Sequence, residues 1–218
     1  TIQKTAQKFC RIRTLEQLAA ALGFPASKIV LQSLHPVYKV YTIRKANGKF
    51  RMIEDPEPAL KKVLRALNEQ LQACYYTQRP DSVHGFCISN DEEEDRGIVS
   101  NATRHIGTPW LLNIDFRDFF HTILSERVHR IWRKQFPRFN EELVQTLTLL
   151  TCYQYRLPMG SPTSPVLSNY AALGLDEDLT AFCKNSCITY TRFADDCSFS
   201  SHQKIDQNTI KIIRDTVA

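Results

Sequence analysis

The chain has 218 residues, of which 43% are hydrophobic and 23% charged, so it holds enough apolar material for a buried core. No apolar run approaches the roughly 18 residues of a membrane span and no signal-like segment opens the sequence, so we expect a cytoplasmic protein without membrane partners. The net charge is +5, but residues 1–90 carry 14 Lys and Arg against 6 Asp and Glu, a net +8. This basic first half suits a phosphate backbone, although a solvated basic face explains it equally well.

Helical patterns open and close the chain. Thr14 can cap a helix over Leu15–Leu22 that Gly23 ends, and a second helix is expected from Ser27. The chain begins without Met and ends inside a helical pattern over residues 206–218, so we expect a fragment of a longer protein.

A basic β-hairpin is predicted next. Residues 37–43 and 50–53 have the composition of strands and flank Asn47-Gly48, a strong hairpin signal. The turn is straddled by four cations: Arg44, Lys45, Lys49 and Arg51. Such a finger suits a triphosphate or template phosphates, and an exposed basic hairpin without a ligand is equally consistent with it.

Further elements follow in order. From Pro58, apolar residues recur at spacings of three and four, which predicts a long helix with one buried face. The acidic run of residues 91–95 is expected to be a solvated insertion. Residues 110–114 read as a buried strand, and Ser125 and Asn140 as caps of two more helices.

Carboxylates lie at the ends of two strand-like runs. Asp115 follows the strand of residues 110–114, and Asp195-Asp196 occupy the turn of a hairpin formed by residues 187–191 and 197–200. If these strands are neighbours, the three carboxylates converge and raise one another's pKa unless a cation binds them. Two magnesium ions roughly 3.5–4 Å apart serve phosphoryl transfer in this way. A lone Asp-Asp in a turn would have no such meaning, because Asp favours turns.

Two other segments add to this reading. The small-residue loop at Met159-Gly160 leads into a helix for which Ser164 would be the N-cap and Pro165 the first residue. Glycine and the free amides of the helix allow close approach to a base pair or phosphate. Phe120 would stand beside an incoming sugar and exclude a 2′-hydroxyl if its segment folds back under Asp115. Without the other motifs, a core phenylalanine beside Phe119 would be the better interpretation.

Together these segments resemble reverse transcriptases, and most closely the bacterial retron type. Asp115 lies in what looks like motif A, Gly160 and Ser164-Pro165 in motif B, and residues 193–196 in the motif C box usually written Tyr-Ala-Asp-Asp. Residues 101–105 match the Asn-Ala-x-x-His element of retron enzymes, and residues 84–86 are similar to their conserved loop. The resemblance covers about residues 10–203.

The resemblance implies an α+β fold with the fingers and palm of a right-hand polymerase, an antiparallel palm sheet packed on helices, and no thumb. The implied parts are a helical N-terminal extension (residues 1–35), fingers (36–108), a first palm segment (109–124), a helical insertion (125–156) and an incomplete second palm segment (157–218).

The resemblance also implies roles for individual residues. The metal ligands would be Asp115, Asp195, Asp196 and the backbone carbonyl of Phe116, holding two Mg²⁺ ions, with Mn²⁺ as an alternative. The incoming nucleotide would be held by Arg44, Lys49, Arg51, Met159, Gly160 and the backbone of Asp118 and Phe119, with Phe120 as the steric gate. Template and primer would contact Ser164, Pro165, Phe193 and Ala194, and Asn101 and His105 would recognise RNA.

The sequence departs from the family pattern at two positions, with Met159 in place of Gln and Phe193 in place of Tyr.

The resemblance implies RNA-directed DNA synthesis on a structured non-coding RNA, with deoxynucleoside triphosphates as substrates and DNA as product. It also implies an effector protein as a further partner and phage defence as the setting. Two alternatives stay open: another defence-associated reverse transcriptase, protein-primed or untemplated, and a non-catalytic RNA-binding subunit. An RNA-copying RNA polymerase is disfavoured by Phe120.

Overall fold

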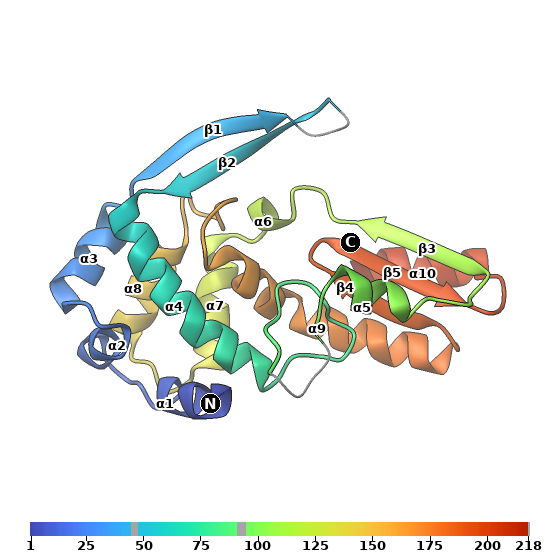
Figure 1. The fold of residues 1–218 in the computed structure, drawn as a ribbon, viewed down its shortest axis with the longest axis horizontal. Coiled ribbons are helices and arrows are strands. Elements are labelled where there is room, and N and C mark those ends of the chain that lie inside the picture. The colour runs from blue at the N-terminus through green and yellow to red at the C-terminus, as the bar shows by residue number, and fades with distance from the viewer. Residues whose placement is uncertain (45–47, 91–94, 218) are drawn as a thin grey trace. The chain divides into compact units, whose positions relative to one another are not determined.

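The computed structural model describes residues 1–44, 48–90 and 95–217 (Figure 1). The chain divides into two compact units, Thr1–Thr77 with Asp118–Ala171, and Gln78–Arg117 with Ala172–Ala218. These boundaries fall inside the implied fingers and palm segments rather than at their ends. Among the described residues, no helix is both long and apolar enough to cross a membrane.

The first unit is mainly helical. The predicted helix after Thr14 is confirmed, because the Thr14 hydroxyl accepts from the Gln17 amide and Gly23 ends the helix with a φ of 72°. Asn140 is likewise a cap, whereas Ser125 is the first helical residue and Leu124 occupies the cap position. The helices of this unit are α1 (Ile2–Phe9), α2 (Leu15–Leu22), α3 (Ala26–Leu34), α4 (Pro58–Tyr76), α6 (Phe119–Thr122), α7 (Ser125–Gln135) and α8 (Glu141–Thr151).

The long helix α4 supplies much of the core of the first unit. Its apolar stripe is buried as the spacing predicts, at Leu60, Val63, Leu64, Leu67, Leu71 and Cys74. An aromatic cluster completes this core, in which the Phe9 ring lies 5.4 Å from Phe136 and 5.7 Å from Phe139, measured between centroids. Burial of such rings is a large part of folding free energy.

The basic hairpin is confirmed as an antiparallel pair of strands, β1 (Tyr38–Arg44) and β2 (Phe50–Pro56), drawn as a long ribbon in Figure 1. Strand β2 extends three residues beyond the predicted end at Ile53. Its last residues become buried, with the Glu54 side chain only 1% exposed. Lys45 and Asn47 lie outside the described residues, as do residues 91–94 of the acidic run.

The second unit holds a three-stranded antiparallel sheet in the order β3–β5–β4. Its strands are β3 (Trp110–Asp115), β4 (Thr189–Phe193) and β5 (Asp196–Ser201), and its helices are α5 (Ile98–Thr103), α10 (Gln207–Val217) and the part of α9 (Ser164–Asn185) from Ala172 onward. One sheet face packs on α9 and α10 through Leu179, Cys183, Tyr190, Cys197, Phe199 and Ile213.

Residues 110–114 form a strand as predicted, but the prediction that this strand is buried is wrong. Trp110 is 44% exposed and Leu111 is 58% exposed. The reason is position: among the described strands, β3 pairs only with β5, and an apolar composition does not distinguish such an edge from a centre.

Candidate active site

The three predicted carboxylates lie at one end of the sheet in the second unit. Strands β3 and β5 are neighbours, which meets the condition stated for convergence, and their register places Asp115 opposite Asp196. Asp195 occupies the short turn between β4 and β5, and its carbonyl accepts a 3.0 Å hydrogen bond from the Phe116 amide. The backbone therefore brings Asp115, Phe116, Asp195 and Asp196 together.

The negative charges of the carboxylates at this end of the sheet repel one another. The pKa of Asp196 is raised, first by partial burial and then by the negative charges of Asp195 and Asp115. None of the ion pairs found among the described residues includes these carboxylates. A bound cation would remove this repulsion.

The residues fit a divalent cation by donor type and by charge. Carboxylate and carbonyl oxygens are the ligands that hard cations prefer. In the part of the chain that the structure describes, however, no three His, Cys, Asp or Glu side chains are grouped closely enough to hold a metal ion.

The turn itself has an uncommon backbone conformation. Ala194 has a φ of 58° although it carries a side chain, and it is 6% exposed. Phe193 precedes it as the last residue of β4 and is half-buried. Hairpins of this kind require a positive φ in the turn, which glycine or asparagine usually supplies.

A buried carboxylate in the first unit was not predicted from the sequence. The side chain of Glu54 accepts hydrogen bonds from the Arg156 guanidinium at 2.8 and 3.1 Å, from Nε2 of His121 at 3.1 Å and from the Met159 amide at 3.0 Å. The Glu54 amide in turn donates to the Met159 carbonyl at 2.7 Å. Strand β2 is thereby joined to the segments that carry Met159 and Phe120, two of the predicted nucleotide contacts.

Gly160 lies directly against this junction. A Cβ atom at position 160 would stand 2.8 Å from the Glu54 carbonyl oxygen, and the φ of Gly160 is 127°, a value that disfavours other residues. Ser164 is the first residue of α9 rather than its cap, and its buried hydroxyl donates to the Pro158 carbonyl at 2.7 Å. Pro165, the next residue, is half-buried. The loop before α9 is thus held by the protein's own contacts.

The segment of the predicted sugar gate forms the short helix α6. Asp118 has a φ of 51°, and its carbonyl accepts from the amides of His121 and Thr122. Phe119 is buried and Phe120 is half-buried, with 5.8 Å between their ring centroids. Of the two rings, Phe119 is therefore the core residue. Among the turn cations that the structure describes, Arg44, Lys49 and Arg51 are exposed.

The element matched to retron enzymes anchors α5 to the sheet. The two ring nitrogens of His105 lie 2.7 Å from the hydroxyls of Ser200 and Thr191, which belong to β5 and β4. Burial lowers the pKa of this ring, so the neutral form is favoured. The side-chain oxygen of Asn101 is buried without a hydrogen-bond partner in the structure. RNA recognition by Asn101 and His105 stays a prediction.

The predicted residues thus form two groups. The carboxylates, the Phe193-Ala194 turn and the Asn101–His105 element belong to the second unit, whereas the hairpin cations, Phe120 and the Met159-Gly160 loop belong to the first. Within each unit the residues are brought together by the contacts described.

Comparison with known proteins agrees with this constellation. The family described as reverse transcriptase (RNA-dependent DNA polymerase) matches residues 43–218. The retron Ec86 reverse transcriptase of Escherichia coli is 33% identical over 170 residues, which cover 75% of this chain and 49% of that protein. The retron Mx162 reverse transcriptase of Myxococcus xanthus is 32% identical, over 89% of this chain and 43% of that protein.

A third relative, the retron Ec83 reverse transcriptase of Escherichia coli, is 28% identical over 84% of this chain and 59% of its own length. The chain therefore spans about half the length of the curated relatives it matches. Because the family match covers most of its residues, this chain belongs to the reverse transcriptase family and is similar to retron members of it.

Proposed function

We propose that the protein carrying this chain is an RNA-directed DNA polymerase that copies a structured non-coding RNA into DNA. The observation that carries this proposal is the placement of Asp115 opposite Asp196, with Asp195 in the adjoining turn. Three mutually repelling carboxylates at one sheet end suit catalytic cations better than they suit stability.

The chain's own residues would hold the catalytic ions. The ligands are Asp115, Asp195, Asp196 and the carbonyl of Phe116. Two magnesium ions, when bound, would activate the attacking hydroxyl and neutralise the charge on the leaving phosphate oxygen. Mn²⁺ meets the same oxygen donors and is the alternative ion.

The nucleotide site is proposed in the first unit, which corresponds to much of the fingers, while the sheet of the second unit corresponds to the palm. The exposed cations of the β1–β2 hairpin bind triphosphate or template phosphates. Phe120 lies against the sugar and excludes a 2′-hydroxyl. The hydrogen bonds of Glu54 to His121 and to the Met159 amide hold the segments of Phe120 and Met159 against strand β2.

Because the chain is similar to retron reverse transcriptases, we also propose a dedicated RNA template, an effector partner and a role in defence against phage. Fingers and palm are the proposed parts of the chain, together with a helical N-terminal extension and a helical insertion. Two alternatives are tested alongside this proposal: another defence-associated reverse transcriptase, protein-primed or untemplated, and an RNA-binding subunit without catalysis.

The decisive experiment sequences the nucleic acid that copurifies with the full-length protein from its host, for the wild type and for Asp195→Asn. A discrete RNA with complementary DNA, present only for the wild type, supports the proposal. RNA without DNA in both proteins supports the binding subunit. DNA without an RNA complement supports untemplated synthesis. Equal loss of RNA and DNA in the variant would mean that Asp195 is structural.

A further inference from the structure

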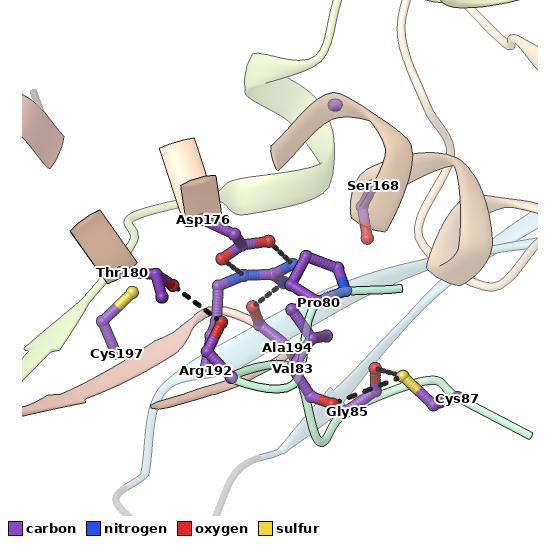
Figure 2. Close-up of polar contacts among 12 residues, drawn as sticks. Pro80, Val83, Gly85, Cys87, Ser168, Asp176, Thr180, Arg192, Ala194 and Cys197 are labelled. Carbon is purple, nitrogen blue, oxygen red and sulfur yellow. Dashed lines mark hydrogen bonds and ion pairs between the residues drawn. The ribbon is translucent and has the colours of Figure 1, made fainter. Parts of the chain in front are cut away.

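A fully buried ion pair contacts Ala194, the residue that precedes Asp195 and Asp196 (Figure 2). Arg192 on β4 and Asp176 on α9 are both 0% exposed, and their side chains meet through two hydrogen bonds of 2.6 and 2.8 Å. The Tyr190 hydroxyl adds a third bond to the Asp176 carboxylate, at 2.7 Å. Removing two charges from water is costly, and apolar residues of similar volume would often be as stable.

The guanidinium also reaches the turn itself. Figure 2 shows Arg192 between Asp176 and Ala194, and its Nη1 atom donates to the Ala194 carbonyl at 2.9 Å. That carbonyl belongs to the peptide that leads into Asp195. Because Ala194 holds a positive φ that costs an L-residue roughly 1–2 kcal/mol, the turn needs support from its surroundings.

A second support comes from the loop that follows α4. The Arg192 amide donates to the Ser82 carbonyl at 2.8 Å, and the His84 amide donates to the Arg192 carbonyl at 2.9 Å. Val83 pairs with Arg192 as a parallel bridge. The loop therefore continues the sheet along β4 up to the start of the turn.

Gly85 in this loop packs against the backbone of Ala194, and no space is left there for a side chain. A Cβ atom at position 85 would stand 2.3 Å from the Ala194 amide nitrogen, so the backbone of one segment or the other would have to move. The carbonyl of Gly85 also accepts a local hydrogen bond from the Cys87 thiol at 3.3 Å.

We propose that Asp176, Arg192 and Gly85 are positioning residues that set the Asp195–Asp196 turn for metal binding. The inference rests on the proposed function, because it assigns these residues to the site of that chemistry. None of the three donates a metal ligand. They act through Ala194, whose carbonyl is held from one side by Arg192 and whose amide is backed by Gly85.

The test compares Gly85→Ala with Gly174→Ala, a matched control. Gly174 lies in α9 within the same unit, and a Cβ atom there would meet nothing within 4 Å. Both changes add one methyl group, but only the first pushes on the turn. Arg192→Lys is the second variant, because it keeps the charge beside Asp176 and loses the fork that also reaches Ala194.

Three measurements are made on the full-length protein after thermal unfolding has shown that each variant is folded. Mn²⁺ alone is titrated by electron paramagnetic resonance, amide hydrogen exchange is followed across residues 193–197 in metal-free protein, and kcat and KM are measured for templated DNA synthesis. We expect Gly85→Ala to weaken Mn²⁺ binding by about 10-fold or more, to accelerate exchange in the turn and to lower kcat with little change in KM.

Gly174→Ala should match the wild type in all three measurements. The inference would be overturned if the Mn²⁺ affinity and the exchange rates of Gly85→Ala lie within twofold of those of Gly174→Ala. If Gly85→Ala does not fold, Arg192→Lys is judged by the same criteria. A wild-type protein that makes no DNA would overturn the proposed function alone, because Mn²⁺ binding and exchange still test the positioning role.

Discussion

Glu54 and Arg156 lie 102 positions apart in the sequence and form an ion pair of 2.8 Å around a carboxylate that is 1% exposed. His121 and the Met159 amide use the same carboxylate, so one side chain collects donors from three segments. A buried carboxylate with several donors stabilises the fold only while its partners stay in place.

Glu54→Gln should therefore lower the free energy of unfolding by about 3 kcal/mol, because it leaves Arg156 without its counter-charge. Asp55→Asn is the matched control, since the Asp55–Lys61 pair is about one-third exposed and should contribute less than about 1 kcal/mol. Urea unfolding of both variants measures the difference. Equal losses of unfolding free energy in the two variants would show that Glu54 contributes no more to stability than a partly exposed ion pair does.

Phe120→Val should relax the selectivity for deoxyribonucleotides. The smaller side chain leaves space beside the sugar, so the ratio of kcat/KM for ribonucleotide to that for deoxyribonucleotide should rise by about 10-fold or more. Phe119→Leu is the control: Phe119 is buried, so stability should fall while the ratio stays constant. An unchanged ratio in Phe120→Val would place the sugar gate elsewhere.

His84 should make the fold sensitive to acid. Burial, followed by the positive charge of Arg96, lowers its pKa to about 4, while its Nδ1 atom lies 2.8 Å from the Ser100 hydroxyl. The folded protein thus favours the neutral ring. Neutral His84 contributes fully to the free energy of unfolding above the unfolded pKa of about 6.5. This contribution, about 3 kcal/mol, is lost as the pH falls towards 4.

The measurement is the free energy of unfolding of the wild type and of His84→Gln at pH 7, 5.5 and 4. The difference between the two proteins should shrink as the pH falls, because glutamine does not titrate. Parallel curves over this range would contradict the assignment.

Asp196→Asn should stabilise the metal-free protein slightly at pH 7. The raised pKa of Asp196 means that its charged form is unfavourable in the folded state, so removing the charge is favourable above that pKa and without effect once the carboxyl is protonated. Because the side chain is exposed, the gain should be below about 1 kcal/mol. Thermal unfolding in EDTA and in Mg²⁺ measures it: Mg²⁺ should stabilise the wild type and not the variant. Destabilisation in EDTA would contradict the expected repulsion.

Local patterns predicted much of this fold. The cap at Thr14, the buried stripe of α4 and the β1–β2 hairpin follow from spacing and turn chemistry within a few residues. The sequence predicted the two carboxylate segments but left open whether their strands are neighbours, and the pairing of β3 with β5 answers that question.

The supports of the site could not be predicted. Glu54 and Arg156, like Gly85 and Ala194, meet because distant backbone segments are packed side by side, and no periodicity in the sequence records such pairs. The exposure of Trp110 was missed for a related reason, since strand order decides it and local composition does not.

Ala194 leaves this hairpin very little freedom to vary. Its φ of 58° favours glycine and disfavours β-branched or bulky residues, and its side chain is only 6% exposed. Glycine would fit the dihedral angle but would also widen the range of conformations open to the turn. Compared with glycine, alanine at position 194 accepts a strained dihedral angle and restricts the conformations of the turn. We therefore expect glycine to be the one substitution that this position tolerates.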